Sequence, residues 1–354
     1  MTVAAFMELA LYDPEYGYYA RAAQRSGRAG DFFTSVDVGP IFGELLEVQI
    51  AEMADLLGPP RHHFDLVEAG AGNGRLAADI LEAMRRRDPA LFDSVDVHLV
   101  EASAPARAQH PAILGDCATR LAASSATLPD AFEGVLVANE LLDAMPVHRV
   151  IQCEDGLREI YVDSDHGRLR LAEGPVSSPV ISEYLSRLGV TLERGWRAEI
   201  NLAAVDWVHD AARRLRRGFM ILIDYGHEAR ELYSVTHSSG TLTTFSGHRA
   251  AGPEEAGAPA WLAHPGERDI TAHVDFTSLR AAAEAEGMQT IAFLDQTYFL
   301  LGLLPSIPNP QSAIRNLQTL LMPGGLGSTM KVLILGKGVG APRLRGCSFS
   351  VRVT

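Results

Sequence analysis

The sequence contains little cysteine and no long apolar run. Cys117, Cys153 and Cys347 are odd in number and far apart, which argues against both a disulfide framework and a zinc site. No apolar run reaches the roughly 20 residues that a membrane-spanning helix needs. Residues 1–20 contain acidic residues but no basic one, so neither a secretory signal nor a transit peptide is predicted. We therefore expect a cytoplasmic protein without a metal site that does not enter a membrane.

Basic residues are also in the minority. Lysine and arginine number 31 against 44 acidic residues, which gives a net charge of −13 over 354 residues. Such a surface repels phosphate backbones, so we do not expect nucleic acid as a substrate. A basic segment of another protein fits this charge better. The hydrophobic content of 47% is typical of a globular protein long enough for a sizeable core with insertions.

A glycine-rich turn lies between two periodic segments. Residues 64–69 are mostly apolar and typical of a strand, and apolar residues recur at helical spacing over 75–87. Between them runs Val67-Glu68-Ala69-Gly70-Ala71-Gly72-Asn73-Gly74. Glycine permits a tight turn and close approach of a ligand, and a following helix presents unpaired N–H groups. A strand, a glycine turn and a helix in this order indicate a nucleotide-binding site, although such a turn alone is also compatible with no ligand.

The spacing of the glycines distinguishes two ligand classes. A dinucleotide fingerprint counted from Gly70 and Gly72 places its third glycine or alanine at Arg75, whose long side chain would obstruct helix–strand packing. This disfavours a nicotinamide-dependent oxidoreductase. The third glycine is instead Gly74, and acid-x-Gly-x-Gly-x-Gly with Glu68 as the acid resembles the first motif of class I S-adenosylmethionine-dependent methyltransferases.

Strands and helices alternate along the rest of the chain, which predicts a parallel sheet covered on both faces. The expected strands are 64–69, 95–101, 112–116, 134–138, 219–223, 288–294 and 329–335. The last two are joined by more than a single crossover helix, as in class I methyltransferases. We therefore expect an α/β fold with a Rossmann-like, seven-stranded, mostly parallel sheet. The expected regions are an N-terminal helical extension over 1–60, a methyltransferase domain over 61–338 with insertions at about 151–200 and 227–269, and a loose tail over 339–354.

Acids at the carboxyl ends of the predicted strands are the candidate binding residues, because ligands of doubly wound sheets lie there. Glu101 ends the second strand, where an acid can accept hydrogen bonds from ribose hydroxyls. Asp116 ends the predicted third strand, near the expected adenine. The insertion after Asp224 is placed above the same face, where a substrate lid would belong.

A second group of polar residues follows the fourth strand. Glu140 and Asp143 lie three residues apart, and a carboxylate pair can hold a planar guanidinium through bidentate hydrogen bonds. An arginine held in this way could be aimed at a methyl donor. The alternative is that Asn139 and Asp143 cap the following turn, which leaves Glu140 as the stronger functional candidate.

Several motifs together resemble the MidA family of S-adenosylmethionine-dependent methyltransferases. They are Leu11 to Tyr19, Gly30-Asp31-Phe32-Phe33-Thr34-Ser35, Phe42-Gly43-Glu44, Glu68 to Gly74, Ala138 to Pro146, Asp224-Tyr225-Gly226 and Asp269 to Phe276. The similarity extends to about Gly338, and the chain departs from the family in having Val36 where proline is usual. The resemblance implies methylation of a protein arginine, because the mitochondrial member of the family dimethylates an arginine of a respiratory complex I subunit and assists its assembly.

The resemblance also implies roles for individual residues. Glu68, Gly70, Gly72 and Gly74 would bind the methionine part of S-adenosyl-L-methionine, Glu101 the ribose and Asp116 the adenine, with Asn139 as a further cofactor-binding residue. Glu140 and Asp143 would orient the acceptor, with Asp31, His248 and Asp275 in the wall. The expected partner is an arginine-bearing protein segment, with a respiratory-complex subunit as one candidate, and a homodimer is a further expectation. The alternative function is an S-adenosylmethionine-binding assembly factor or chaperone with little catalytic activity.

Overall fold

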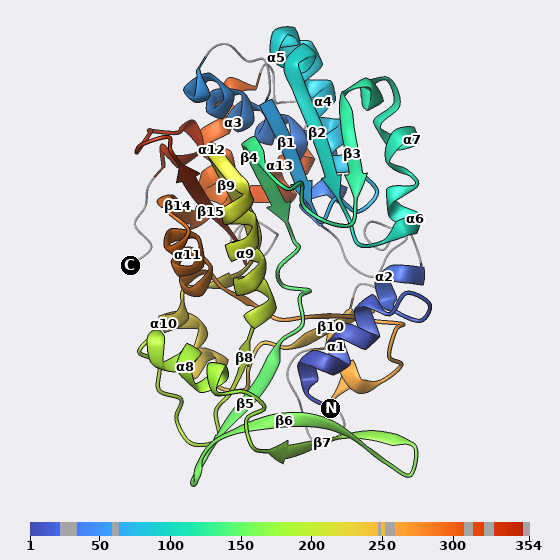
Figure 1. Ribbon diagram of the computed structural model, residues 1–354, viewed down its shortest axis with the longest axis vertical. Coiled ribbons are helices and arrows are strands. Elements are labelled where there is room, and N and C mark those ends of the chain that lie inside the picture. Colours follow the sequence, from blue (N-terminus) through green and yellow to red (C-terminus); the bar gives the residue numbers. More distant parts are fainter. Residues whose placement is uncertain are drawn as a thin grey trace.

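The apolar runs of the sequence form the central sheet of the computed structural model (Figure 1). The structure describes residues 1–21, 34–58, 64–246, 249–251, 259–307, 314–321 and 329–349. In spatial order the strands are β14 (Gln289–Asp295), β15 (Met330–Lys337), β9 (Leu215–His227), β4 (Phe132–Asn139), β1 (Phe64–Ala69), β2 (Val95–Val100) and β3 (Leu121–Ser125). Only β15 runs antiparallel to its neighbours in this order, and the short β13 (Val274–Asp275) pairs with β9. The predicted seven-stranded, mostly parallel fold is confirmed.

Alternating side chains of the strands form two separate cores. In β1, Leu66 faces one layer of helices, whereas Val67 faces the other. The first layer contains α3 (Ile41–Leu57), α4 (Arg75–Arg87), α12 (Gln296–Leu303) and α13 (Ile314–Leu321), and the second contains α9 (Leu202–Arg214) and α11 (Phe276–Ala285). Helices on both faces explain why the central strands are apolar on both sides.

The predicted third strand is wrong. Residues 112–116 lie in α7 (His110–Leu114) and the 3-10 helix η2 (Gly115–Arg120). Pro111 occupies the first turn of α7, where proline is favourable, and Gly115 follows the helix with a φ of 53°. The real β3 lies at the sheet edge, and after Leu121 it consists of alanine and serine of alternating exposure, so its hydrophobic signal is weak.

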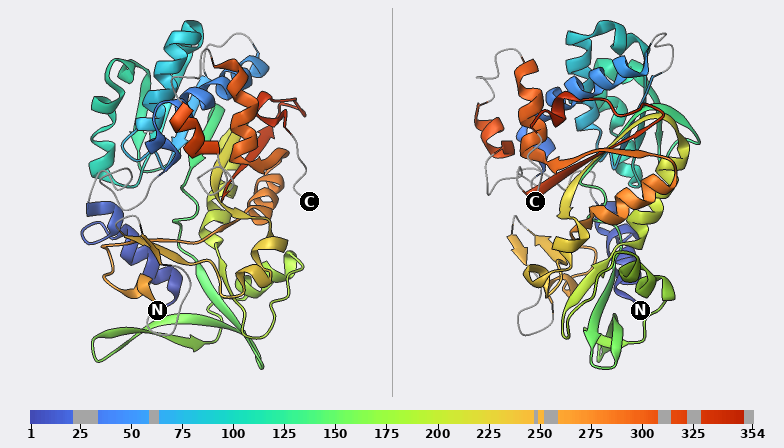
Figure 2. Two further views of the ribbon diagram at one scale, coloured as in Figure 1. Left: turned by 180° about the vertical axis from the view of Figure 1, so that it is seen from behind. Right: turned by 90° about the vertical axis from the view of Figure 1, so that its left-hand side faces the viewer.

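Both insertions and the N-terminal helix form a second part of the molecule beneath the sheet in Figure 1. After β4, an antiparallel sheet contains β5 (His148–Cys153), β6 (Gly156–Asp165), β7 (Arg168–Gly174) and β8 (Arg197–Ile200), with α8 (Pro179–Arg187) between β7 and β8. After β9 come α10 (Ala229–Leu232) and a small sheet of β10 (Thr243–Ser246), β11 (Arg249–Ala251) and β12 (Asp269–Thr271). Helix α1 (Val3–Tyr12) packs its apolar residues against both insertions, and Figure 2 shows the helix beside them.

The tail that the sequence predicts to be loose is packed against the rest of the molecule over its described residues. Leu344 is buried, and the amide of Gly346 donates to Gln49 Oε1 on α3 at 3.0 Å. The 3-10 helix η7 (Arg345–Cys347) thereby packs against α3 and α12. Within the described residues, no helix is both long and apolar enough to cross a membrane.

Candidate functional site

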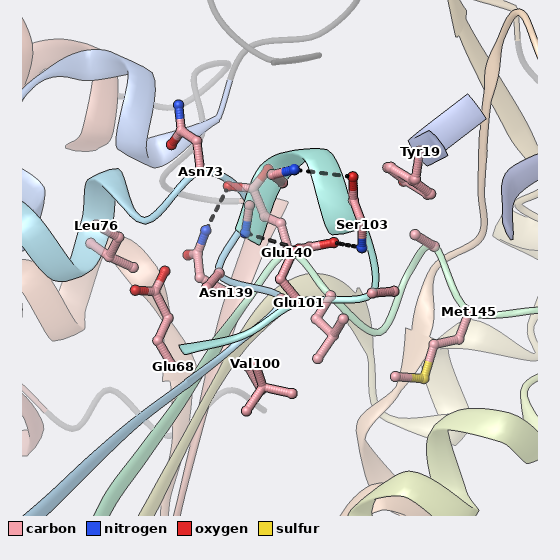
Figure 3. A pocket seen from close by; sticks show the side chains of 18 of the residues that line it. Tyr19, Glu68, Asn73, Leu76, Val100, Glu101, Ser103, Asn139, Glu140 and Met145 are labelled. Atoms are coloured by element: carbon pink, nitrogen blue, oxygen red, sulfur yellow. Dashed lines mark hydrogen bonds between the residues drawn. The ribbon is translucent and has the colours of Figure 1, made fainter. Parts of the chain in front are cut away.

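A cavity of about 620 Å³ lies where β1, β2 and β4 end. Its wall includes the glycine turn, the segment after β2, the segment after β4, and Tyr12 and Tyr19 from the N-terminal region. Figure 3 shows Glu68, Glu101 and Glu140 around this cavity. Parallel strands thus bring together the polar residues that follow them, as the sequence predicts.

The glycine turn adopts a backbone that requires glycine. Gly70, Gly72 and Gly74 have φ angles of 72°, 53° and 88°. A Cβ on Gly70 would lie 3.0 Å from Leu141 Cδ1, whereas a Cβ on Gly72 would meet no protein atom within 4 Å. Gly72 lines the cavity, so its missing side chain leaves room for a ligand against the backbone.

Glu101 is tied to this turn. Its Oε2 accepts a hydrogen bond from the Gly72 amide at 2.9 Å, and its Oε1 accepts one from the Ser103 amide at 2.7 Å. A carboxylate offers about four lone-pair sites, so two remain for other donors. Glu101 therefore both positions the turn and presents a carboxylate to the cavity.

His110 supports the glycine turn from the side away from the cavity. The sequence did not identify this residue. The fully buried ring lies 2.9 Å from Gly72 O through Nε2 and 2.9 Å from Ser124 Oγ through Nδ1. A carbonyl can only accept, so Nε2 carries the proton and Nδ1 accepts from the serine hydroxyl. The sequence offered no signal for this pair, because the contact depends on how α7 packs against β3.

Two buried acceptors in the cavity have no hydrogen-bond partner among the described residues. They are Glu68 Oε2 and Asn139 Oδ1. Burial is the main cause that raises the pKa of Glu68 to about 8, and the carboxylates of Glu101 and Asp79 add to it. Buried acceptors without donors are rare in folded proteins, so this pair fits a cationic, hydrogen-bond-donating group of a ligand.

Arg75 takes a different position from the one that the dinucleotide comparison assumed. Its guanidinium donates to Asp37 Oδ1 at 3.2 Å and to the carbonyl of Val36. These contacts join α4 to the 3-10 helix η1 (Ser35–Val38), and all three residues line the cavity. The side chain points away from the helix–strand contact and closes one side of the cavity.

Glu140 points into the cavity from a strained backbone. Its φ of 52° is left-handed, which costs about 1–2 kcal/mol for a residue with a side chain. Its amide donates to Ile223 O at 2.8 Å, and its Oε1 accepts from the Ser35 amide and from Asn139 Nδ2, each at 3.1 Å. Burial raises its pKa to about 8. Strain of this kind is typical of a functional position.

Asp143 lies behind the cavity wall and does not line it. Burial raises its pKa well above the ordinary value, and the carboxyls of Asp224, Asp269 and Glu140 raise it further. The turn after β4 is capped mainly by Asp224, whose Oδ2 accepts from the amides of Leu142 at 2.7 Å and Asp143 at 3.3 Å. In the sequence, Asp224 was marked only by its position directly after a very apolar run.

Other predicted residues lie elsewhere. Asp116 has a 90% exposed side chain beside Arg85 and does not line the cavity, because the expected strand is a helix. Asp275 caps α11, where it accepts from the amides of Thr277 and Ser278, and it is not a wall residue of the cavity. Asp31 and His248 lie outside the described residues.

Comparison with known proteins identifies the family. Residues 45–294 match the model of a family described as "Putative S-adenosyl-L-methionine-dependent methyltransferase". The chain is 31% identical to the mitochondrial protein arginine methyltransferase NDUFAF7 of Danio rerio, over 80% of this chain and 68% of that one. It is 29% identical to the mitochondrial NDUFAF7 homolog of Drosophila melanogaster, over 97% of this chain and 83% of that one.

A solved structure agrees with these matches. A protein from Burkholderia thailandensis, crystallised with S-adenosyl-homocysteine bound, is 30% identical and superimposes with a TM-score of 0.87, over 99% of this chain and 91% of that one. The chain therefore belongs to this family of S-adenosyl-L-methionine-dependent methyltransferases. The predicted family and the predicted cofactor are confirmed.

Proposed function

We propose that this member of the S-adenosyl-L-methionine-dependent methyltransferase family transfers methyl groups to an arginine side chain of a protein substrate. The names of its relatives support this acceptor, since those from Danio rerio and Mus musculus are protein arginine methyltransferases. The wall of the cavity supports it independently. The observation that carries the proposal is the group of buried carboxyls at and behind Glu140.

The residues at the carboxyl ends of β1 and β2 fit S-adenosylmethionine. S-adenosylmethionine supplies a methyl group that its sulfonium sulfur already activates. The unpartnered oxygens of Glu68 and Asn139 suit the ammonium group of the methionine part, and the two free lone-pair sites of Glu101 suit the ribose hydroxyls. The open space at Gly72 leaves room for the ligand beside the turn.

The acceptor side is strongly acidic. The carboxyls of Asp224, Asp269 and Glu140 act on that of Asp143 through their charges, and Asp224 also acts on Glu140. Burial raises the pKa values of Glu140, Asp143 and Asp224. Buried carboxylates without a cation are unfavourable. An arginine side chain that enters here would offset this repulsion and would find a carboxylate geometry suited to a planar guanidinium.

Glu140 is the member of this group that faces the cavity, so we assign it the direct contact. It would orient the guanidinium and accept the proton that the acceptor nitrogen loses at or after methyl transfer. Asp143 would act on the acceptor indirectly, through its electrostatic interaction with Glu140. Tyr12 and Tyr19 hold the neighbouring wall, because their hydroxyls donate to Ala144 O at 3.1 Å and Asp269 Oδ1 at 2.9 Å.

We further propose that the insertions after β4 and β9 form the side from which the acceptor protein enters. A respiratory-complex subunit, a homodimer and a cytoplasmic location stay predictions from the sequence. The curated relatives are named as mitochondrial proteins.

Radiolabelled methyl transfer tests the proposed acceptor. The chain is incubated with labelled S-adenosylmethionine and a lysate of cells that lack it, and labelled peptides are sequenced by mass spectrometry. We expect label on an arginine nitrogen of a protein. Label on another residue type or on a small molecule would overturn the acceptor. Cofactor binding without any transfer would support the assembly-factor alternative.

A further inference from the structure

Three histidines from separate segments meet outside the cofactor cavity. His227 ends β9, His237 lies in the 3-10 helix η3 (Val235–His237), and His273 lies between β12 and β13. Each offers a ring nitrogen within 4.8 Å of the other two. The ring centroids are 4.8 Å apart for His227 and His237, 5.4 Å for His227 and His273, and 5.8 Å for His237 and His273. The sequence did not predict this cluster because its members are far apart in the chain.

Hydrogen bonding leaves nitrogens of this cluster available. His273 Nδ1 is buried and has no hydrogen-bond partner among the described residues, whereas His227 Nδ1 faces the Glu231 carboxylate. His237 Nδ1 lies 3.1 Å from the carbonyl of Glu231 and 3.2 Å from Thr236 Oγ1. In the tautomer that donates to the carbonyl, Nε2 carries a free lone pair. A ring N–H donated to a backbone carbonyl is the usual arrangement of a metal-binding histidine.

A carboxylate also lies beside the cluster, because Glu231 Oε1 is 3.1 Å from His227 Nδ1.

We propose that His227, His237 and His273 form a binding site for one divalent transition-metal ion, with zinc as the best-suited ion. Imidazole nitrogens bind zinc as well as copper, iron and nickel, and three histidines with one further oxygen ligand make the tetrahedral set that zinc adopts. Zinc–nitrogen bonds of about 2.0–2.1 Å place tetrahedral ligand nitrogens roughly 3.4 Å apart. The three ring nitrogens lie within 4.8 Å of one another, so side-chain rotation would have to bring them closer around one ion.

The position of the cluster indicates a structural role. A bound ion would connect the base of the second insertion to the end of β9. His273 follows Ala272, whose amide donates to Asp143 O at 2.9 Å. The ion would therefore fix the wall behind the acceptor carboxyls and leave the cofactor residues untouched. The alternative is that the three rings simply stack without an ion.

Metal titration separates these two possibilities. The protein is treated with a chelator, desalted and titrated with Zn²⁺ against a chromophoric competitor, and in parallel with Co²⁺, whose visible absorption reports tetrahedral coordination. We expect one equivalent of each ion to bind. His237→Ala should weaken zinc binding by more than the roughly 10–100-fold that loss of an outer-shell partner costs.

The matched control is His166→Asn. The side chain of His166 is 98% exposed outside the cluster, and asparagine tolerates its left-handed φ of 48°. His273→Gln is a second variant that keeps much of the side-chain volume. Binding of S-adenosyl-homocysteine by each variant verifies its fold. Absence of stoichiometric zinc binding, or unchanged affinity in a folded His237→Ala or His273→Gln protein, would overturn the site.

Discussion

The Oε2 atom of Glu101 accepts a hydrogen bond from the amide of Gly72 at 2.9 Å. This contact joins the acid after β2 to the glycine turn after β1, so a single side chain shapes two walls of the cavity. Cofactor binding and the geometry of the turn should therefore respond together when this carboxylate is removed.

Replacing Glu101 with alanine should weaken the binding of S-adenosyl-homocysteine by roughly 10- to 100-fold, because hydrogen bonds to a charged group contribute about 1.5–3 kcal/mol. Isothermal titration calorimetry measures the change. Asp116→Ala is the control, since that side chain is exposed and does not line the cavity. Equal affinities of the wild type and Glu101→Ala would remove the ribose assignment.

Replacing His110 with phenylalanine should destabilise the protein by about 1–3 kcal/mol, because the Gly72 carbonyl and the Ser124 hydroxyl lose their buried partner. Affinity for S-adenosyl-homocysteine should fall as well, since the turn loses its support. Urea unfolding and calorimetry measure the two effects. His209→Phe changes a histidine that does not line the cavity and should leave affinity unchanged. Wild-type affinity in a stable His110→Phe protein would contradict the proposed support.

The raised pKa of Glu68 makes stability depend on pH. The native carboxyl has a pKa of about 8 against 4.5 for the ordinary group, so the native state holds a proton that the unfolded state releases. The stabilisation that this proton contributes to the native state is fully present below about pH 4.5 and is lost as the pH rises through about 8. The free energy of unfolding should therefore fall across this window, and Glu68→Gln should reduce the slope. Urea unfolding at several pH values measures it, and identical slopes would contradict the buried environment.

The sequence predicted the elements whose signals are local and periodic. Strand β1 and helix α4 lie where predicted, because β1 is a short, mostly apolar run and the apolar spacing of α4 is helical over its whole length. Strand β3 was missed because it lies at an edge and contains mainly small residues, and Asp116 was misplaced with it. The glycine turn and Glu101 were predicted because their positions follow from the order of a parallel sheet.

The remaining site residues depend on contacts between distant segments. His110 supports Gly72 only because α7 packs beside the turn, and Ser35 reaches Glu140 only because η1 lies against the segment after β4. Asp224 could have been proposed from its place after β9, but its role as the cap of the turn after β4 is visible only in three dimensions. Periodicity carries no information about such pairs.

Replacing Glu140 with glutamine tests the central claim most directly. The claim is that this residue contacts the methyl acceptor and does not bind the cofactor. The substitution keeps the side-chain size and removes the charge that would hold a guanidinium and take its proton. Calorimetry with S-adenosyl-homocysteine and quantitative mass spectrometry of methylarginine in the acceptor protein are performed on the same preparation. We predict near-wild-type cofactor affinity with methyl transfer lowered by about 10²–10⁴-fold. A Glu140→Gln protein that methylates arginine at the wild-type rate would contradict the account.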